Sequence, residues 1–275
     1  MFSLILLGTG SPIPDPKRAG PAMLVKAGNL SIVVDAGRGL MMRLASAGIP
    51  APAVSALMLT HLHSDHTQDI SDLLTTRWVL PVDAQPLEIL GPSGTAELLE
   101  QTIETMTTDI AYRMAHHDDL IEPPTFNVTE VGPGVILERD GLVVRSALVD
   151  HAPVDPALGF RFEYEGKVLA ISGDTRPCAG LSELAAGADV YVQNVVRRSL
   201  IEHSPIQRFR DVLDYHSNLE ETGVTASRAG VSRVVLSHIV PPPDDSADTG
   251  IVAEVRSSGF EGEVIVGSDL LEIAI

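Results

Sequence analysis

The sequence predicts one α/β domain over residues 1–275. Short apolar runs that read as strands alternate with helical patterns along the whole chain, and no linker, repeat or low-complexity tract separates them. A hydrophobic content of 44% supplies enough apolar side chains for a large core. We therefore expect a mixed fold in which helices cover a sheet.

The elements follow one another from the first residues onward. Strands are expected at 2–7, 22–26 and 30–34, with Ala27-Gly28-Asn29 as a turn, and a helix at 38–47 follows them. Further strands are expected at 55–59, 87–90, 142–148, 158–164, 167–172, 189–193, 232–237 and 263–266, and further helices at 68–76, 94–108 and 219–229.

The start of the chain and its cysteine content favour the cytoplasm. Residues 1–8 have no basic flank and are too short to cross a membrane, so they read as a buried strand rather than an export signal. Cys178 is the only cysteine, which rules out an internal disulfide. We expect a cytoplasmic protein without membrane contact.

The net charge argues against a nucleic-acid partner. Nineteen Lys and Arg stand against 37 Asp and Glu, which gives a formal charge of −18. Such a surface repels polyanions unless its few basic residues gather beside the site. Arg197, Arg198, Arg208 and Arg210 are candidates for such a cluster. We expect them to form a solvated surface instead.

The segment from His61 to His66 predicts a metal site. His61, His63, Asp65 and His66 lie within six positions, directly after the strand expected at 55–59. One histidine beside a strand is usually structural, but four such groups without a metal would need many compensating partners. Imidazole and carboxylate together suit zinc, with manganese or iron as alternatives.

Three more candidate ligands each follow an apolar run. His151, Asp174 and His238 come after the strands expected at 142–148, 167–172 and 232–237. Each could have a structural role by itself, and Asp174 also fits a turn. If these strands point the same way, their ends meet at one rim of the sheet.

These motifs together resemble the metallo-β-lactamase fold hydrolases. The resemblance is carried by Thr60–His66, Asp150-His151, Ser172–Thr175 and Ser237-His238, with Val34–Gly37 as an earlier match. It implies a four-layer αββα sandwich with two divalent metal ions at one edge. It also implies the ligands: His61, His63 and His151 for one metal, Asp65, His66 and His238 for the other, and Asp174 bridging them.

Within that superfamily the chain is most similar to the ribonuclease Z and arylsulfatase-like branch. Residues 8–12, 173–178 and 216–217 carry this similarity. It implies that His216 donates a proton, although His216 could instead face solvent while Ser217 or Asn218 caps a helix. Dimers are common in this branch, so a homodimer is expected by analogy.

Two departures from that branch favour a small substrate. His151 and Asp174 are only 23 positions apart, which leaves no room for the long arm of ribonuclease Z proteins that trim transfer RNA. The basic loop of the family is also altered, reading Pro14-Asp15-Pro16-Lys17-Arg18-Ala19-Gly20-Pro21. We therefore expect a zinc-dependent hydrolase in which a metal-bound hydroxide, oriented by Asp65, attacks a small phosphodiester, sulfate ester, carboxylic ester or lactone.

Two other functions stay open. One is a ribonuclease Z-type endonuclease that processes the 3′ end of tRNA, and the other is a non-hydrolytic metal-binding or iron-dependent oxygen-chemistry protein. Some supporting roles are open as well. Asp35 or Asp69 could fix the imidazoles, although each also suits a turn or a helix cap. The loop at 241–246 is expected near the site, and the remaining histidines, His116, His117 and His203, are expected at the surface.

Overall fold

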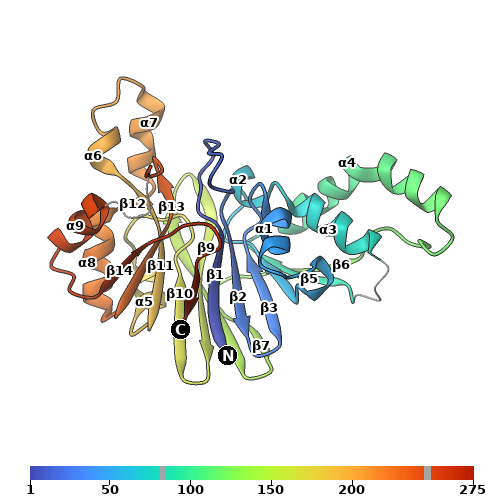
Figure 1. Cartoon of the computed structure of the whole chain (residues 1–275), viewed down its shortest axis with the longest axis horizontal. Helices are drawn as coiled ribbons and strands as arrows, with labels where there is room; N and C mark the ends of the chain where they lie inside the picture. Colours follow the sequence, from blue (N-terminus) through green and yellow to red (C-terminus); the bar gives the residue numbers. More distant parts are fainter. Residues whose placement is uncertain (81–84, 245–248) are drawn as a thin grey trace.

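The computed structural model describes residues 1–80, 85–244 and 249–275 and has two sheets packed face to face (Figure 1). Within the described residues, the first sheet has seven strands, in the spatial order β15 (Glu272–Ala274), β1 (Phe2–Gly8), β2 (Ala22–Ala27), β3 (Leu30–Val34), β4 (Ala56–Met58), β5 (Leu87–Gly91) and β6 (Phe126–Glu130).

The second sheet follows the same mixed pattern of parallel and antiparallel pairs. Its strands lie in the order β14 (Glu263–Val266), β13 (Arg233–Val240), β11 (Val190–Val196), β10 (Lys167–Ile171), β9 (Val154–Tyr164), β8 (Leu142–His151) and β7 (Gly134–Arg139), with the short β12 (Ser217–Asn218) paired to β11. Because β9 is antiparallel to both β8 and β10, and β10, β11 and β13 are mutually parallel, β8, β10, β11 and β13 all end at the same rim.

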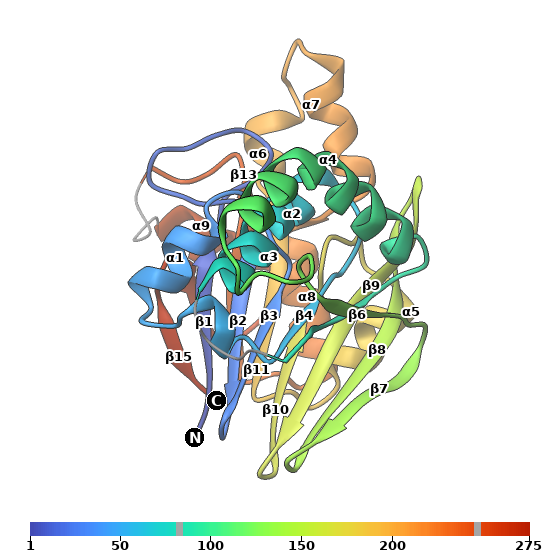
Figure 2. The same ribbon diagram turned by 90° about the vertical axis from the view of Figure 1, so that its right-hand side faces the viewer.

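Helices cover the outer face of each sheet (Figure 2). The first sheet carries α1 (Leu40–Ser46), α3 (Ile70–Val79) and α4 (Thr95–His116), together with the single-turn α2 (Ser64–Thr67) and a 3₁₀ turn, η1 (Ala51–Ala53). The second carries α5 (Ala179–Ala185), α8 (Leu219–Ala229) and α9 (Thr249–Ser257). The expected four-layer αββα sandwich is therefore confirmed.

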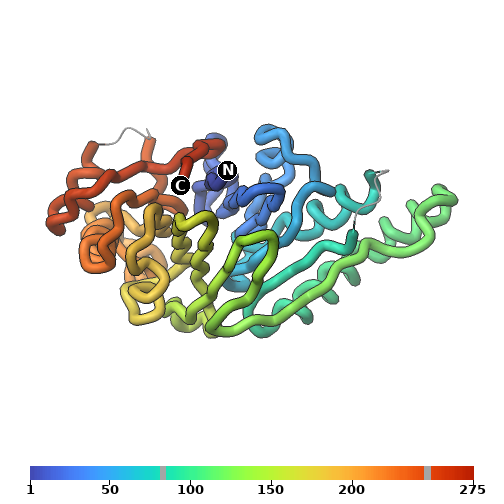
Figure 3. The backbone as a smooth tube through the Cα atoms, turned by 90° about the horizontal axis from the view of Figure 1, so that it is seen from below, coloured from blue at the N-terminus to red at the C-terminus, as the bar shows by residue number. Residues whose placement is uncertain are grey.

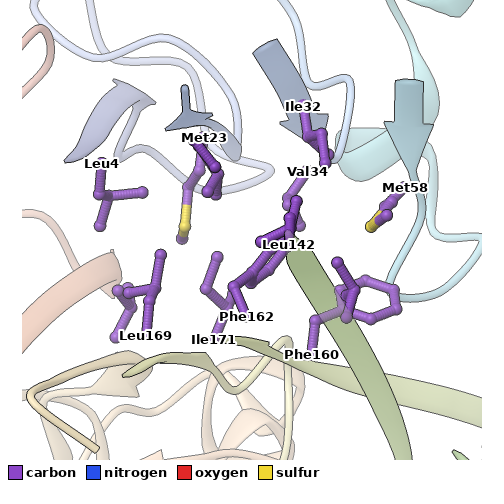
Figure 4. Packing of buried hydrophobic residues seen from close by; sticks show 14 of the residues in the cluster. Leu4, Met23, Ile32, Val34, Met58, Leu142, Phe160, Phe162, Leu169 and Ile171 are labelled. Carbon is purple, nitrogen blue, oxygen red and sulfur yellow. The ribbon is translucent and has the colours of Figure 1, made fainter. Parts of the chain in front are cut away.

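The side chains along each strand alternate between two faces, and this explains why the sheets pack against each other on one face and against helices on the other. In β1, Leu4 and Leu6 belong to the core between the two sheets, whereas Ile5 and Leu7 belong to the core beneath the helices. Successive side chains of a strand point to opposite faces, so a strand covered on both faces reads as a continuous apolar run. Figure 4 shows the core between the sheets, where Phe160 and Phe162 of β9 pack with residues such as Met23 and Met58 of the first sheet.

The sequence located most elements but missed some. The helix expected at 94–108 continues to His116, and β6, β7, β15, α5 and α9 were not expected. Strand β15 pairs with β1 in antiparallel fashion, which brings the two ends of the chain close together (Figure 3). No helix among the described residues is long and apolar enough to cross a membrane.

A protruding segment lies above the rim at which β11 and β13 end. We call residues 198–214 the cap segment; it contains α6 (Arg198–Ile201), α7 (Gln207–Asp211) and a 3₁₀ turn, η2 (Val212–Asp214). Figure 1 shows α6 and α7 projecting from the sandwich. The connection from β11 to β12 thus passes over the rim of the second sheet.

Candidate metal centre

The predicted ligands come together at one rim of the sandwich. His61 follows β4, His151 ends β8, Asp174 follows β10, and His238 lies near the end of β13. The turn of α2 adds Asp65 and His66 from the same loop as His61. His61, His151, Asp174 and His238 therefore lie at or near strand ends, as the sequence predicts, and the parallel arrangement of these strands brings the ends together.

Asp174 lies at the centre of this cluster. It is buried, and its Oδ2 atom faces imidazole nitrogens from five different histidines. The Nε2 atoms lie at 3.2 Å for His216, 3.3 Å for His66, 3.6 Å for His238, and 3.9 Å for both His61 and His151. This position would let the Asp174 carboxylate serve as a donor to either side of the cluster.

Two sets of donors surround Asp174. His61, His63, His151 and Asp174 could hold one cation, and Asp65, His66 and His238 could hold a second one. In the first set, the Nδ1 atom of His63 lies 3.0 Å from His61 Nε2 and 3.4 Å from His151 Nε2. In the second set, Asp65 Oδ2 lies 3.2 Å from His238 Nε2. Except for His63, all these residues are buried.

Hydrogen bonds outside the cluster fix the tautomers of two histidines. His66 Nδ1 donates to Asp35 Oδ2 at 2.8 Å, and Thr60 Oγ1 lies 2.9 Å from the same carboxylate oxygen. Because the Thr60 hydroxyl donates to Asp35, its oxygen accepts from His61 Nδ1 at 3.0 Å. One carboxylate therefore orients His66 directly and His61 through Thr60.

The inward nitrogens suit a metal ion. His151 Nδ1 donates to the carbonyl oxygen of Tyr215 at 2.9 Å, so the lone pair of its Nε2 points into the cluster. The same holds for His66, whose Nε2 has no hydrogen-bond partner within the described part of the chain. Buried lone pairs that converge in this way are destabilising unless a cation accepts them. The residues present therefore fit a pair of divalent metal ions.

The charge states of His61 and Asp174 match those of metal ligands. Burial lowers the pKa of His61 well below its ordinary value, which leaves the imidazole neutral. Burial raises the pKa of Asp174, but the surrounding imidazoles of His238, His66 and His216 outweigh burial and bring the pKa well below its ordinary value. Metal ligands must be neutral imidazoles and ionised carboxylates. For His66 and His238, burial lowers the pKa, but the carboxylates of Asp174, Asp35 and Asp65 outweigh burial and raise it, so these two imidazoles lose a proton when a metal ion binds.

His216 lies beside this centre and is buried, so the alternative in which it faces solvent is wrong. Its Nδ1 atom is 3.1 Å from the carbonyl oxygen of Val212, which can only accept, so Nδ1 carries a hydrogen and Nε2 faces Asp174. The helix that follows is capped by Asn218, which accepts from the backbone N–H of Glu221. Capping by Asn218 and a site position for His216 thus occur together.

The structure adds a residue that the sequence did not single out. Asn194 in β11 is buried, and its Nδ2 donates to Asp174 Oδ1 at 2.7 Å. This bond turns the other oxygen, Oδ2, toward the imidazoles. Asn194 follows Gln193 in an apolar strand and lies near the carboxyl end of that strand, and this position is the only signal in the sequence that could have drawn attention to it.

The two candidates for supporting carboxylates have different roles. Asp35 contacts the cluster, and it does so with a backbone φ of 61°, a left-handed conformation that is uncommon for a residue other than glycine. Asp69 instead accepts from the backbone N–H of Gly39 at 2.7 Å, at the start of α1. His238 also has a positive φ, of 46°. Unusual backbone conformations thus occur at the site, as they often do at functional positions.

A cavity of about 290 Å³ opens beside the centre. Part of its lining is formed by Ser11, Pro12 and Ile13, and another part comes from the cap segment and from Pro241. Pro241 thus borders the site as expected, whereas Asp245 and Ser246 lie outside the described residues. His116, His117 and His203 are exposed, as predicted.

Comparison with known proteins identifies the family. A model of the β-lactamase superfamily domain matches residues 31–239. A protein named ribonuclease Z from Mycolicibacterium gilvum is 48% identical over 279 residues, which cover 100% of this chain and 96% of the relative. A ribonuclease Z from Mycolicibacterium paratuberculosis is 48% identical and is covered to 99%. The chain belongs to the ribonuclease Z family.

Solved structures show the same fold. The metallo-β-lactamase fold protein YhfI from Bacillus subtilis matches with a TM-score of 0.77 at 18% identity, with both chains covered completely. The short form of human tRNase Z matches with a TM-score of 0.73 at 21% identity, with 99% of each chain covered. None of the relatives described here supports the arylsulfatase side of the expected branch.

The predictions of a small ester substrate and of no nucleic-acid partner are wrong. Relatives that match the whole chain at 48% identity are named ribonuclease Z. An alignment of 277 positions covers all 275 residues of this chain and 99% of the M. paratuberculosis protein, so that relative has no room for a long inserted arm either. The short interval from His151 to Asp174 therefore does not argue against this family.

The charge argument was also too coarse. A net charge of −18 sums the whole surface, whereas a polyanion responds to the field near the site. Arg198, Arg208 and Arg210 lie on the cap segment, and Arg208 lines the cavity beside the metal centre. Of the arginines that we expected to form a solvated surface, Arg208 therefore lies at the site.

Proposed function

We propose that this protein is a ribonuclease Z, a zinc-dependent endonuclease that hydrolyses a phosphodiester bond at the 3′ side of a tRNA precursor. The observation that carries the proposal is the match of the whole chain, at 48% identity, to relatives named ribonuclease Z. A cluster of histidines and aspartates that fits two divalent metal ions supports it.

The proposed ligands follow the two donor sets. His61, His63 and His151 would hold one zinc ion, Asp65, His66 and His238 the other, and Asp174 both. When bound, the two ions lower the pKa of a water molecule toward about 7 and polarise the phosphoryl oxygen. Nitrogen donors with carboxylates suit zinc, although manganese shares much of this preference.

The chain's own residues complete the reaction. Asp65 is buried and ionised, so its carboxylate can accept a proton from the attacking water and hold it in line. His216 keeps a hydrogen on Nδ1 through the Val212 carbonyl, which leaves Nε2 as the atom that carries a second proton toward the substrate. We propose that this proton neutralises the oxygen of the leaving ribose.

The test is incubation of the purified protein with a tRNA precursor that carries a 3′ trailer. We expect cleavage at the end of the acceptor stem, loss of cleavage after chelation, and recovery with zinc. The proposal fails if protein with two bound metals hydrolyses bis(p-nitrophenyl) phosphate but leaves the precursor intact at every salt concentration. Low salt is included because binding to RNA weakens steeply as salt rises.

A further inference from the structure

Three buried polar atoms near the ends of β11 and β13 have no hydrogen-bond partner among the residues that the structure describes. They are Oδ1 of Asn194, Oγ of Ser237 and Nδ1 of His238, and these residues are 2%, 1% and 2% exposed. A buried polar group without a hydrogen bond is destabilising, so three of them close together indicate a missing partner. We propose that Asn194, Ser237 and His238 hold one internal water molecule, which orients the imidazole of His238 in the metal centre.

The pairing of β11 with β13 places two of these groups side by side. Asn194 and Ser237 are register partners in neighbouring parallel strands, which lie about 4.8 Å apart. Val192 and Val235, two positions earlier in each strand, belong to the core between the sheets. Because side chains alternate along a strand, the amide of Asn194 and the hydroxyl of Ser237 both point to this inner face.

A local irregularity in β13 directs His238 to the same side. Leu236 and Ile239 both belong to the core on the outer face, although a regular strand would separate two residues of one face by an even number of positions. The extra residue between them is accommodated at His238, whose φ of 46° departs from the strand conformation. Ser237 points inward, and the imidazole of His238 is therefore directed to the metal centre instead of the outer face.

The carboxylate of Asp174 connects His238 to Asn194. Nε2 of His238 lies 3.6 Å from Asp174 Oδ2, and Nδ2 of Asn194 donates to Asp174 Oδ1 at 2.7 Å. The imidazole and the amide thus contact the two oxygens of one carboxylate. The atoms without partners, Nδ1 of His238 and Oδ1 of Asn194, are the second polar atoms of the same two side chains.

The three groups complement one another but share no hydrogen bond. When Nε2 of His238 binds a metal ion, Nδ1 carries the ring hydrogen and can only donate. Oδ1 of Asn194 can only accept, whereas the hydroxyl of Ser237 can do either. A water molecule among them can accept from Nδ1, donate to Oδ1 and form a third hydrogen bond with Oγ, which is the usual number for a buried water.

This water would complete the support of the imidazoles. His66 and His151 bond through Nδ1 to Asp35 and to the carbonyl oxygen of Tyr215, whereas His238 has no such partner within residues 1–80, 85–244 and 249–275. A ligand histidine nearly always donates its other ring N–H to a carboxylate, a carbonyl or a water, and this bond fixes the orientation of the ring. The water therefore acts on His238 as Asp35 acts on His66.

The inference rests on the metal centre of the proposed function, but its first test needs no substrate. High-resolution crystal structures of the protein with and without zinc are compared. We expect one ordered water at about 2.7–3.2 Å from Oδ1 of Asn194, Oγ of Ser237 and Nδ1 of His238. A water can also donate to Nδ1, so the site should be occupied in both forms. A direct bond from Ser237 to His238 with no water between them would overturn the inference.

Metal affinity tests the role of the water. Ser237→Ala removes one of its partners and should weaken the binding of one zinc ion about tenfold, while the other ion binds as before, because His238 is a proposed ligand of only one ion. Ser237→Thr keeps the hydroxyl and should restore the affinity. Ser232→Ala is the same change at an exposed position just before β13 and serves as the matched control. Competition with a chromophoric chelator gives the affinities of both ions.

The outcomes separate this inference from the proposed function. If Ser237→Ala binds both ions as Ser232→Ala does, or if Ser237→Thr binds zinc as weakly as Ser237→Ala, the positioning role is overturned, and cleavage of the tRNA precursor would still stand. If the water is present and Ser237→Ala loses affinity for one ion, but the unaltered protein does not cleave the precursor, the water site is supported and the tRNA function fails.

Discussion

The metal centre and the cap segment meet at the same cavity but are held in place by different means. The centre is buried and is joined by contacts between distant residues, such as His238 to Asp65 and His216 to Asp174. The cap segment has two helices of four and five residues, and most of its hydrogen bonds are local, as between Gln207 and Asp211, although Ser199 also donates to Glu254 of α9 at 3.5 Å. Isolated helices of this length are marginal in water. The sandwich therefore holds the metal centre through contacts between distant residues, whereas the cap segment is held mainly by contacts within itself.

Among changes that test this difference between the metal centre and the cap segment, loss of the Asp174 carboxylate should have the largest effect. Asp174→Asn removes the charge that faces five imidazoles while keeping the size of the side chain. We expect metal content to fall from about two ions per chain and kcat/KM on bis(p-nitrophenyl) phosphate to fall about 1000-fold, or about 4 kcal/mol. Elemental analysis and initial rates measure both. Asp119→Asn, at an exposed position, should change neither, and retention of both metals in the Asp174 variant would contradict its bridging role.

His216→Ala should separate chemistry from metal binding. We expect both metals to remain and kcat to fall by about 10²- to 10⁴-fold, because a proton donor is lost without loss of a ligand. The loss should be largest for diesters with poor leaving groups, which need protonation most. A series of aryl phosphodiesters measures this dependence. Equal losses across the series, or loss of a metal ion, would show that His216 has a different role.

Asp35 and Asp69 allow a matched comparison. The sequence predicted that one of them orients the imidazoles but did not indicate which one. Asp35→Asn disturbs the bonds that orient His66 and His61, so metal affinity should fall about 10- to 100-fold. Asp69→Asn changes a residue that accepts from the backbone at the start of α1 and should leave affinity unchanged. Competition with a chromophoric chelator gives both values. Equal effects would mean that Asp35 acts only through general stability.

The smallest effect is expected from a change at Asp269, which holds the loop that contains Ser11 and Ile13. Asp269 accepts from the backbone N–H of Thr9 at 3.0 Å and of Ala19 at 2.7 Å, and from Arg43 at 2.9 Å. It thereby anchors the ends of the loop that contains Ser11 and Ile13. Asp269→Asn should lower the free energy of unfolding by about 1–3 kcal/mol. Urea unfolding measures this change, and an unaltered midpoint would show that the loop is held by other contacts.

The sequence located most of the clustered candidate ligands because His61, His151, Asp174 and His238 each lie at or near the end of an apolar run. His151, Asp174 and His238 could be chosen on that ground, and the resemblance to a known family then gave the pairing. It did not predict the role of Asn194, because nothing in a strand sequence says which side chain of the neighbouring strand it will contact. Elements such as β7, with its exposed and half-buried residues, carry too weak an apolar pattern to be recognised.

The substrate inference failed for a physical reason. The net charge and the spacing of His151 and Asp174 are read from the linear sequence. The attraction of a polyanion instead depends on where individual charges lie in the folded structure. Arg208 is 34 positions from Asp174 in the sequence yet lines the same cavity. That proximity arises because the chain between β11 and β12 passes over the rim.

By itself, the sequence determined an α/β fold and a set of candidate metal ligands, because apolar periodicity and the chemistry of histidine and aspartate are local properties. Only the tertiary structure decided that Asp174 is central, that Asp35 rather than Asp69 orients the imidazoles, and that the cap segment places Arg208 and Phe209 at the cavity. These outcomes depend on parallel strands that end at a common rim and on contacts between residues up to 173 positions apart. Such contacts form only when the whole chain has folded.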